Sequence, residues 1–336
     1  MTKIALAIHG GAGTILRSSM TPELEREYRD GLENALDVGW KVLSAGGNAL
    51  DAVEETVCSL EDFPLFNAGR GSVFTHDGKN EMDASIMDGK NLTAGAIAFV
   101  RNVKNPIKLA RLVMEKTPHV LLAANGANQF AKEMGVTLQP DEYFFTDHRW
   151  EQLLKAREEG VVQLDHAVTT SADQTPHSAF RTPHSKGTVG AVACDDRGNL
   201  AAATSTGGMT NKKFGRVGDT ALIGSGTYAD NATCAVSCTG HGEFFMLGVT
   251  AFDVAARMKY KRIDLETAAN ETLERLTEIG GEGGFIAVDG QGNVVLPFNS
   301  EGMYRGYRTE ASSVVMTQAD ANAVHECFAG PVRPTM

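Results

Sequence analysis

A threonine directly follows a glycine, Gly187-Thr188, where the chain changes character most sharply. If the chain were cut between these two residues, Thr188 would become a new N-terminus. Its hydroxyl would then be a nucleophile, and its free α-amine would be a base on the same residue. The dipeptide is equally typical of an ordinary junction between a loop and a strand, so other parts of the chain must distinguish the two interpretations.

The segments on either side of this junction differ in composition. The preceding run, about 161–187, has two prolines, three histidines and little apolar periodicity, which predicts a mobile surface segment. Its histidines lack a regular i,i+4 pair and indicate solvated side chains rather than metal ligands; they are His166, His177 and His184. The following run, Val189–Cys194, is apolar and predicts one strand of a hairpin with Leu200–Ser205.

Composition limits the classes of partner and compartment. The chain has 336 residues, of which 42% are hydrophobic, so it can bury a sizeable core. A net charge of -11 without a basic face argues against nucleic acid, and no apolar run approaches membrane-spanning length. The N-terminus lacks the apolar core of a signal peptide. The cysteines are odd in number and form no CxxC pair, which indicates reduced thiols; they are Cys58, Cys194, Cys234, Cys238 and Cys327. We therefore expect a cytoplasmic protein.

The elements before Thr188 begin with an apolar run, Lys3–Ile8, which predicts a buried strand. A glycine-rich turn, His9–Gly13, is expected to end it. A helix capped by Thr21 is predicted to continue to about Ser44, and a second covers Ala49 to about Leu60. A short strand is predicted at Val73–Thr75.

The elements after the first hairpin are two predicted strands, two predicted helices and a second hairpin. They cover, in that order, Leu222–Gly226, Thr233–Thr239, Gly242–Lys259, Asp264–Ile279 and the pair Gly284–Val288 with Asn293–Leu296. This order predicts strands packed on strands with helices outside, a layered α/β arrangement.

Seven short motifs lie in one order along nearly the whole chain. They are Ile8-His9-Gly10-Gly11-Ala12-Gly13, Asn67-Ala68-Gly69, Gly187-Thr188-Val189-Gly190-Ala191-Val192, Thr204-Ser205-Thr206-Gly207-Gly208, Gly215-Arg216-Val217-Gly218-Asp219, Cys238-Thr239-Gly240-His241-Gly242-Glu243 and Phe298-Asn299-Ser300-Glu301-Gly302-Met303. Together they resemble the plant-type L-asparaginase and isoaspartyl aminopeptidase family of N-terminal nucleophile hydrolases. The resemblance implies an α/β (α+β) fold, a four-layer αββα sandwich, made as one domain. It also implies self-cleavage into subunits 1–187 and 188–336, and a dimer of the cleaved αβ units.

The resemblance also assigns roles around the nucleophile. Thr188 is the nucleophile, and Thr206 contacts it and helps to orient and polarise it. Arg216 would hold the α-carboxylate of a small-molecule or dipeptide substrate, because a planar guanidinium can bind a carboxylate through two hydrogen bonds. Asp219 would accept a hydrogen bond from the α-ammonium group of the substrate.

The motif after the predicted strand Thr233–Thr239 supplies the remaining groups. By resemblance, the Thr239 hydroxyl and the Gly240 N–H form the oxyanion hole, where one donor in other enzymes contributes about 2.7–4 kcal/mol. Gly242 would contact the substrate ammonium through its carbonyl. His241 lies between these residues and is expected to be a neighbour of the site rather than a catalyst.

No catalytic metal or other cofactor is implied by the residue spacings. The resemblance does imply a structural sodium ion, held by a loop of backbone carbonyls. The matching positions are Leu60, Glu61, Phe63, Phe66, Ala68 and Arg70.

The expected reaction has two stages. Thr188 first cuts the chain through an N-to-O acyl shift, and then attacks the side-chain carbonyl of L-asparagine or a β-aspartyl (isoaspartyl) peptide to release L-aspartate. A free α-amine with a reference pKa of roughly 7.7–8.0 is a suitable base near neutral pH. One alternative is a glycosylasparaginase, a related type of enzyme that is usually secretory or lysosomal. A second is a non-catalytic protein that binds an amino acid or nucleotide with its glycine turns and does not cut itself.

Overall fold

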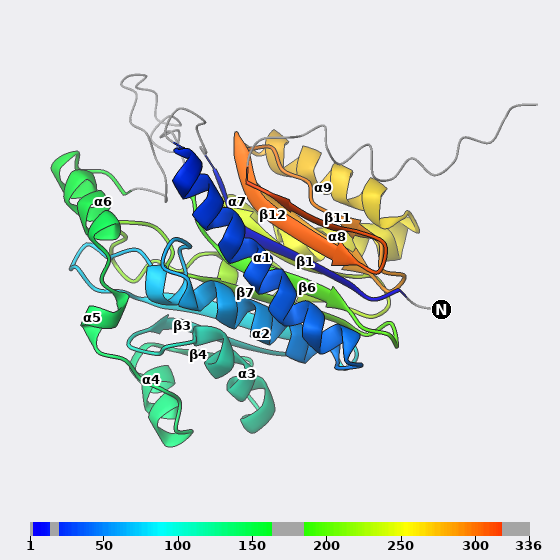
Figure 1. The fold of residues 1–336 in the computed structure, drawn as a ribbon, viewed down its shortest axis with the longest axis horizontal. Helices are drawn as coiled ribbons and strands as arrows, with labels where there is room; N and C mark the ends of the chain where they lie inside the picture. The colour runs from blue at the N-terminus through cyan, green and yellow to red at the C-terminus, as the bar shows by residue number, and fades with distance from the viewer. Residues whose placement is uncertain (1–2, 14–19, 163–184, 318–336) are drawn as a thin grey trace, which may run out of the picture.

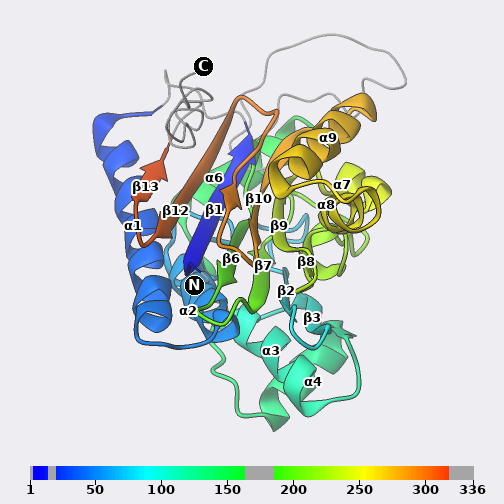
Figure 2. The same ribbon diagram turned by 90° about the vertical axis from the view of Figure 1, so that its right-hand side faces the viewer.

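A computed structural model of the chain describes residues 3–13, 20–162 and 185–317. These residues form two β-sheets packed face to face, with helices on both outer sides (Figure 1, Figure 2). This confirms the predicted four-layer αββα sandwich. The predicted mobile segment lies mostly outside the described residues, and so do its three histidines.

The larger sheet carries the strand that follows Thr188. In spatial order its strands are β13 (Ser313–Met316), β12 (Gly302–Thr309), β1 (Ala5–Gly13), β6 (Val189–Cys194), β7 (Leu200–Thr206), β2 (Met82–Asp88), β3 (Thr93–Val100) and β4 (Leu121–Ala123). A further short strand, β5 (Ser185–Lys186), pairs with β1. Because β6 pairs with β1 on one side and β7 on the other, Thr188 lies at the end of a central strand.

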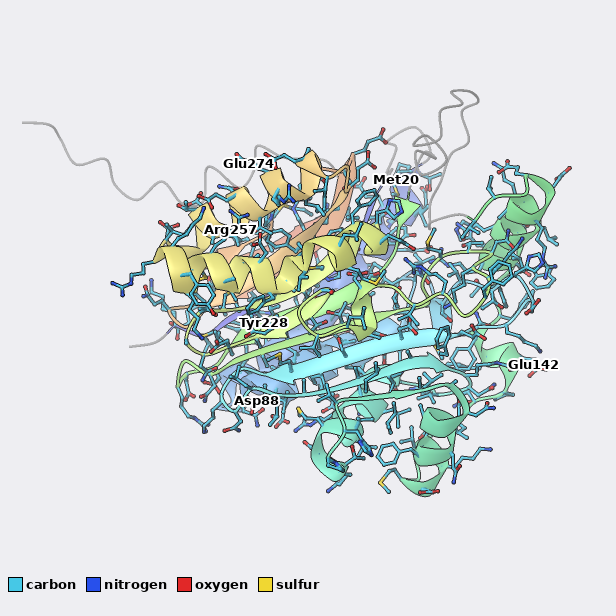
Figure 3. All side chains as sticks on the ribbon, turned by 180° about the vertical axis from the view of Figure 1, so that it is seen from behind. Met20, Asp88, Glu142, Tyr228, Arg257 and Glu274 are labelled. Carbon is cyan, nitrogen blue, oxygen red and sulfur yellow. The ribbon has the colours of Figure 1, made fainter. Side chains whose placement is uncertain are left out.

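The smaller sheet covers one face of the larger sheet. Its strands, in spatial order, are β11 (Val294–Val295), β10 (Gly283–Asp289), β9 (Cys234–Gly240) and β8 (Thr227–Ala229). Its outer face is covered by α7 (Gly242–Gly248), α8 (Thr250–Ala256) and α9 (Leu265–Glu278). Figure 3 shows Arg257 and Glu274 on this outer layer.

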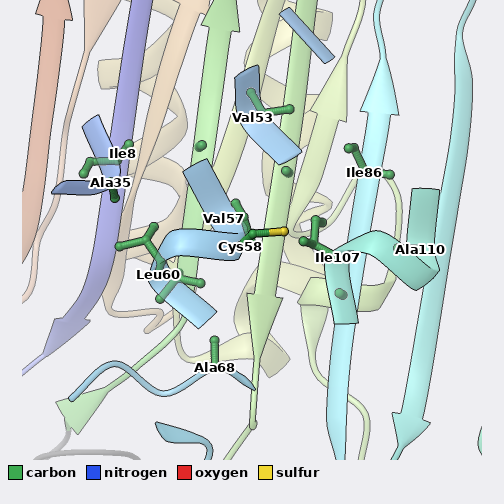
Figure 4. Packing of buried hydrophobic residues seen from close by; sticks show 14 of the residues in the cluster. Ile8, Ala35, Val53, Val57, Cys58, Leu60, Ala68, Ile86, Ile107 and Ala110 are labelled. Atoms are coloured by element: carbon green, nitrogen blue, oxygen red, sulfur yellow. The ribbon is translucent and has the colours of Figure 1, made fainter. Parts of the chain in front are cut away.

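The other outer layer consists of α1 (Pro22–Ser44), α2 (Ala49–Asp62) and α3 (Pro106–Lys116). Figure 4 shows Val53 and Val57 of α2 and Ile107 of α3 packed against the sheet beside Ile8 and Ile86. Three further helices follow along the chain: α4 (Ala124–Glu133), α5 (Asp141–Phe144) and α6 (Asp147–Glu158). Within the described ranges, no helix combines the length and the apolar character that crossing a membrane requires.

Local sequence signals predicted several elements correctly. The Thr21 hydroxyl caps α1 by accepting a hydrogen bond from the Leu24 N–H, and Asn48 caps α2 in the same way through Asp51. The predicted reduced thiols are also confirmed for the part of the chain in view, where Cys58, Cys194, Cys234 and Cys238 are free and buried. Cys327 lies outside the described residues.

The predicted glycine turn at His9–Gly13 is wrong, because β1 continues through Gly13. A bulge between His9 and Gly11 absorbs the irregularity, and Gly11 has a φ of 121°, which favours glycine. The longer strand brings His9 beside β6, where its register partner is Gly190.

The predicted single helix Gly242–Lys259 is also wrong. The helix is interrupted at Val249, which has a φ of 47°. A second helix, α8, follows it and leads into a π-helical turn at Arg257–Lys261. The break arises because the Phe252 N–H bonds to the Gly224 carbonyl, in a loop outside the helix, at 2.8 Å. That same loop replaces the predicted strand Leu222–Gly226, and β8 begins only after it.

The predicted strand at Val73–Thr75 is an irregular segment. Its backbone pairs with no strand: the Val73 N–H donates to Asn67 Oδ1, and the Asn80 amide donates to the carbonyls of Ser72 and Val73. The Thr75 N–H donates to the Lys79 carbonyl, which closes a turn. The bond from the Val73 N–H also fixes the orientation of the Asn67 amide, which takes part in the site described below.

Candidate active site

Thr188 lies buried between the two sheets, immediately before β6. Its Oγ1 donates to Thr206 Oγ1 at 3.2 Å, across the pairing of β6 with β7. Thr206 in turn donates to the Gly187 carbonyl at 3.0 Å. The structure therefore brings together the predicted nucleophile, its predicted partner and the carbonyl of the bond between Gly187 and Thr188.

A second donor on the Gly187 carbonyl is Asn67, whose Nδ2 lies 2.8 Å from the oxygen. The other end of this amide is held by the Val73 N–H at 3.0 Å, and Nδ2 also donates to the Gly208 carbonyl. Two donors on one carbonyl oxygen are the arrangement that stabilises negative charge when that carbonyl is attacked. Asn67 had no predicted role, although the motif Asn67-Ala68-Gly69 contained the signal.

A small pocket opens beside Thr188. It is lined by Gly187, Thr188, Thr206, Gly208, Met209, Arg216, Gly218, Asp219, Thr220 and Gly240. The predicted nucleophile, the predicted carboxylate and ammonium partners and one predicted oxyanion donor thus line one cavity, although they come from three separate stretches of sequence.

Two further predicted site residues do not line the pocket. Thr239 is buried, and its Oγ1 accepts a hydrogen bond from the Ala12 N–H at 3.2 Å. Gly242 lies against the charged residues, because a Cβ added there would be 2.7 Å from Asp219 Oδ1 and 2.9 Å from Arg216 Nη2. A larger residue at Gly242 would displace both side chains.

Arg216 is held by the carboxylate of Glu243, which had no predicted role. Its Nε and Nη2 donate to the two oxygens of Glu243 at 2.9 and 2.8 Å. Its Nη1 faces the pocket, since a Cβ on the lining residue Gly218 would lie 2.8 Å from it. The bidentate pair therefore fixes the guanidinium and leaves its remaining edge towards the cavity.

Asp219 is the second charged group of the cavity. Burial raises the pKa of its carboxyl to about 7, although the positive charge of Arg216 acts to lower it. Its Oδ2 is buried and, among the described residues, has no hydrogen-bond partner. An oxygen in this position needs a donor from a ligand, and a substrate ammonium group would supply one.

His241 is the N-cap residue of α7 and is not part of the pocket lining. Its Nε2 lies 3.5 Å from Glu243 Oε2, and its ring packs edge-on against Phe244. It borders the ion pair of Arg216 rather than the nucleophile, as expected from the sequence.

The loop predicted to hold sodium follows α2 and turns tightly at Gly69–Gly71. The carbonyl oxygens of Glu61 and Phe66 face this turn, because Cβ atoms added at Gly69 and Gly71 would lie 2.4 and 2.2 Å from them. The Arg70 guanidinium packs over the Tyr143 ring instead. Carbonyl oxygens are ligands that suit a hard cation, and those of Glu61 and Phe66 lie at this turn. The described residues contain no group of three or more His, Cys, Asp or Glu side chains that could hold a metal.

Comparisons with known proteins agree with this geometry. A sequence profile of the asparaginase family matches residues 2–317. The chain is 52% identical over 308 residues to a protein of Salmonella typhimurium named isoaspartyl peptidase, covering 91% of this chain and 96% of that protein.

Two further relatives extend the comparison. An isoaspartyl peptidase of Escherichia coli is 50% identical over 308 residues, covering 91% of this chain and 93% of that protein. An isoaspartyl peptidase/L-asparaginase of Mus musculus is 44% identical over 302 residues, covering 89% of this chain and 86% of that protein. With its four-layer fold and its buried glycine-threonine junction, the chain belongs to the asparaginase family.

Proposed function

We propose that this protein cuts itself between Gly187 and Thr188, and then uses Thr188 to release L-aspartate from isoaspartyl dipeptides and L-asparagine. The observation that carries the proposal is the convergence on one peptide bond: Thr188 Oγ1 bonds to Thr206, and both Thr206 and Asn67 donate to the Gly187 carbonyl. The names of the relatives supply the class of substrate.

In the first stage, Thr188 Oγ attacks the Gly187 carbonyl carbon. Negative charge on the carbonyl oxygen is stabilised by the amide of Asn67 and the hydroxyl of Thr206. The proton lost by the Thr188 hydroxyl is gained by the Thr188 nitrogen, which leaves as an amine, so the amide becomes an ester. Water then opens the ester, which gives a carboxylate at Gly187 and a free hydroxyl and amine at Thr188.

In the second stage, the free α-amine of Thr188 accepts the hydroxyl proton as Oγ attacks the side-chain carbonyl of the substrate. Arg216 Nη1 binds the substrate α-carboxylate and Asp219 binds the α-ammonium. The Gly240 N–H and the Thr239 hydroxyl stabilise the oxyanion. Ammonia or an amino acid leaves with the proton, and water hydrolyses the acyl-enzyme to aspartate.

The proposal is tested by measuring aspartate release from β-Asp-Leu, L-asparagine and asparagine glycosylated on its side chain. The expected result is release from the first two, with none from a Thr188→Ala control. Release from the glycosylated substrate alone would favour the glycosylasparaginase alternative. Release from none of the three by cleaved protein would contradict the proposed reaction.

We also propose that the loop Leu60–Arg70 binds a structural sodium ion through the carbonyls of Leu60, Glu61, Phe63, Phe66, Ala68 and Arg70. A bound cation stabilises the folded state by mass action. The melting temperature should therefore be higher in sodium chloride than in choline chloride at equal ionic strength, and equal values would contradict the proposal. A cytoplasmic location and a dimer of αβ units complete the proposal; the four free, buried thiols suit a reducing compartment.

A further inference from the structure

A chain of buried polar side chains crosses the space between the two sheets and ends on the nucleophile residue. His9 of β1 lies with Nδ1 2.9 Å from the Thr188 carbonyl oxygen and Nε2 2.9 Å from Ser237 Oγ. Ser237 Oγ lies 2.7 Å from Thr204 Oγ1, which accepts a hydrogen bond from Thr227. His9, Ser237, Thr204 and Thr227 are completely buried, each with 0% exposure.

The direction of these hydrogen bonds follows from the acceptor at their end. The Thr188 carbonyl can only accept, so His9 Nδ1 must carry the proton. Burial lowers the pKa of His9 to about 3, although the bond to Thr188 acts to raise it, so the ring is neutral and has a single N–H. Nε2 is therefore the acceptor, and Ser237 donates to it. Thr204 then donates to Ser237, and the Thr188 carbonyl selects the Nδ1–H tautomer of His9.

Gly190 of β6 leaves room for the contact between His9 and Ser237. A Cβ added to Gly190 would lie 2.0 Å from Ser237 Oγ and 2.4 Å from His9 Nε2. Apolar side chains, Ala7 and Val192 among them, pack in the same layer between the sheets. Polar groups buried in such a layer are costly unless they are hydrogen-bonded, which makes this bridge a specific feature of the core.

Two separate sets of hydrogen bonds fix the carbonyl groups of Gly187 and Thr188. Asn67 and Thr206 hold the carbonyl of Gly187, whereas His9 holds the carbonyl of Thr188. After the bond between Gly187 and Thr188 is cut, the first carbonyl belongs to the other piece of chain. The hydrogen bond from His9 remains on Thr188, the residue that carries both the nucleophile and its base.

We propose that His9, held in place through Nε2 by Ser237, is a positioning residue that holds the Thr188 carbonyl and so orients the new N-terminal residue for hydrolysis. The inference rests on the proposed function, since it concerns the cleaved enzyme. Holding the carbonyl restricts rotation of Thr188 about its Cα–C bond, and this rotation sets where its hydroxyl and amine point. Self-cleavage depends on the separate hydrogen bonds to the Gly187 carbonyl and should depend less on His9.

The test compares His9→Asn and His9→Phe. Asparagine can place an N–H close to the position of Nδ1, whereas phenylalanine keeps the ring and loses both nitrogens. The control is Val288→Ala, a cavity in the same layer between the sheets that leaves the network intact. For each variant, self-cleavage is measured on a denaturing gel, kcat and KM on β-Asp-Leu per cleaved chain, and the melting temperature by thermal unfolding.

The expected result for His9→Phe is self-cleavage with kcat lowered about 10- to 100-fold and KM within about twofold, because a small misplacement of a reacting group has this effect. His9→Asn should recover most of kcat, and Val288→Ala should lose stability but keep kcat. The inference is overturned if His9→Phe keeps kcat within about twofold of wild type. It is also overturned if His9→Asn is no better than His9→Phe.

A variant that leaves His9 unchanged covers the case in which His9→Phe does not fold. Ser237→Ala removes the hydroxyl that holds Nε2 and so leaves the His9 ring less firmly placed. The value of kcat should therefore fall severalfold while KM stays constant; an unchanged kcat would overturn the inference. Wild-type protein that is cut but releases no aspartate would instead contradict the proposed function. The two failures are therefore distinguishable.

Discussion

Arg216 shows how a single charged side chain is prepared for a ligand. Its pair with Glu243 uses Nε and Nη2, so the guanidinium cannot rotate and Nη1 stays towards the cavity. Arginine suits this task better than lysine, because its planar group can bond to two carboxylates on different edges. The sequence positions of Arg216 and Asp219 alone do not indicate that Glu243 is the partner of Arg216.

Replacing Glu243 by alanine should therefore weaken substrate binding. We expect Glu243→Ala to raise KM for L-asparagine about tenfold, since a hydrogen bond to a charged group contributes about 1.5–3 kcal/mol. The effect on kcat should be smaller, because the nucleophile is untouched. Glu274→Ala, an exposed acid on α9 (Figure 3), is the matched control and should leave KM unchanged. A KM for Glu243→Ala equal to that of wild type would contradict this role.

Asp219 predicts the pH dependence of binding. Its pKa is raised to about 7 by burial, so the carboxyl is protonated and neutral at lower pH and cannot pair with an ammonium group. KM should therefore fall as pH rises through about 7. Initial rates across this range test the point, with Asp219→Asn expected to show a high KM that does not follow this ionisation. A wild-type KM that is constant with pH would contradict the assignment.

At the scale of elements, Glu61 connects two helices to the central sheet. It lies near the end of α2, and its Oε1 accepts from the Ile107 N–H of α3 at 3.0 Å and from Ser205 of β7 at 2.6 Å. Burial raises the pKa of Glu61 to about 8, although both hydrogen bonds act to lower it. The folded protein therefore favours the protonated acid, whereas the unfolded chain favours the carboxylate above its ordinary pKa of about 4.3.

This difference predicts how stability changes with pH. Between about pH 4.5 and 8 the folded state binds more protons at Glu61, so this group's contribution to the unfolding free energy falls as pH rises, by at most about 1.4 kcal/mol per pH unit. Glu61→Gln mimics the protonated acid and lacks this loss. Melting temperatures at pH 6 and pH 8 should show the variant gaining on wild type as pH rises. A difference that does not change with pH would show that Glu61 does not titrate in this way.

The sequence predicts an element well where local residues decide it. The caps at Thr21 and Asn48 and the hairpin of strands around Asp195–Asn199 are local features, and the structure confirms these elements. The break at Val249 depends on carbonyls of a separate loop, and the bridge from His9 to Ser237 joins residues 228 positions apart. Neither leaves a local pattern. The grouping of Arg216 and Asp219 beside Thr188 was expected from the resemblance, because spacing alone does not bring them together.

At the scale of the whole molecule, the two predicted pieces are interleaved. The strand β1 from the first piece lies between β12 and β6 from the second, and β2 from the first pairs with β7 from the second. Cutting the bond before Thr188 breaks no pairing between these strands. The pieces should therefore stay together through the backbone hydrogen bonds and buried surface that both contribute.

Size exclusion tests this prediction. Cleaved protein in native buffer should elute as one species containing both pieces, at the 35.8 kDa of the uncut chain or at the mass of its dimer. The pieces should separate only in denaturant. Elution of separate pieces under native conditions would contradict the arrangement of the strands.

The most direct test of the account is the intact mass of the purified protein under denaturing conditions. Wild type should give two chains, residues 1–187 and residues 188–336, with threonine at the new N-terminus. Thr188→Ala should give the single uncut chain and release no aspartate. An uncut wild-type chain that still hydrolyses β-Asp-Leu, or a Thr188→Ala chain cut at the same bond, would contradict the central claim that Thr188 is both the cleavage site and the nucleophile.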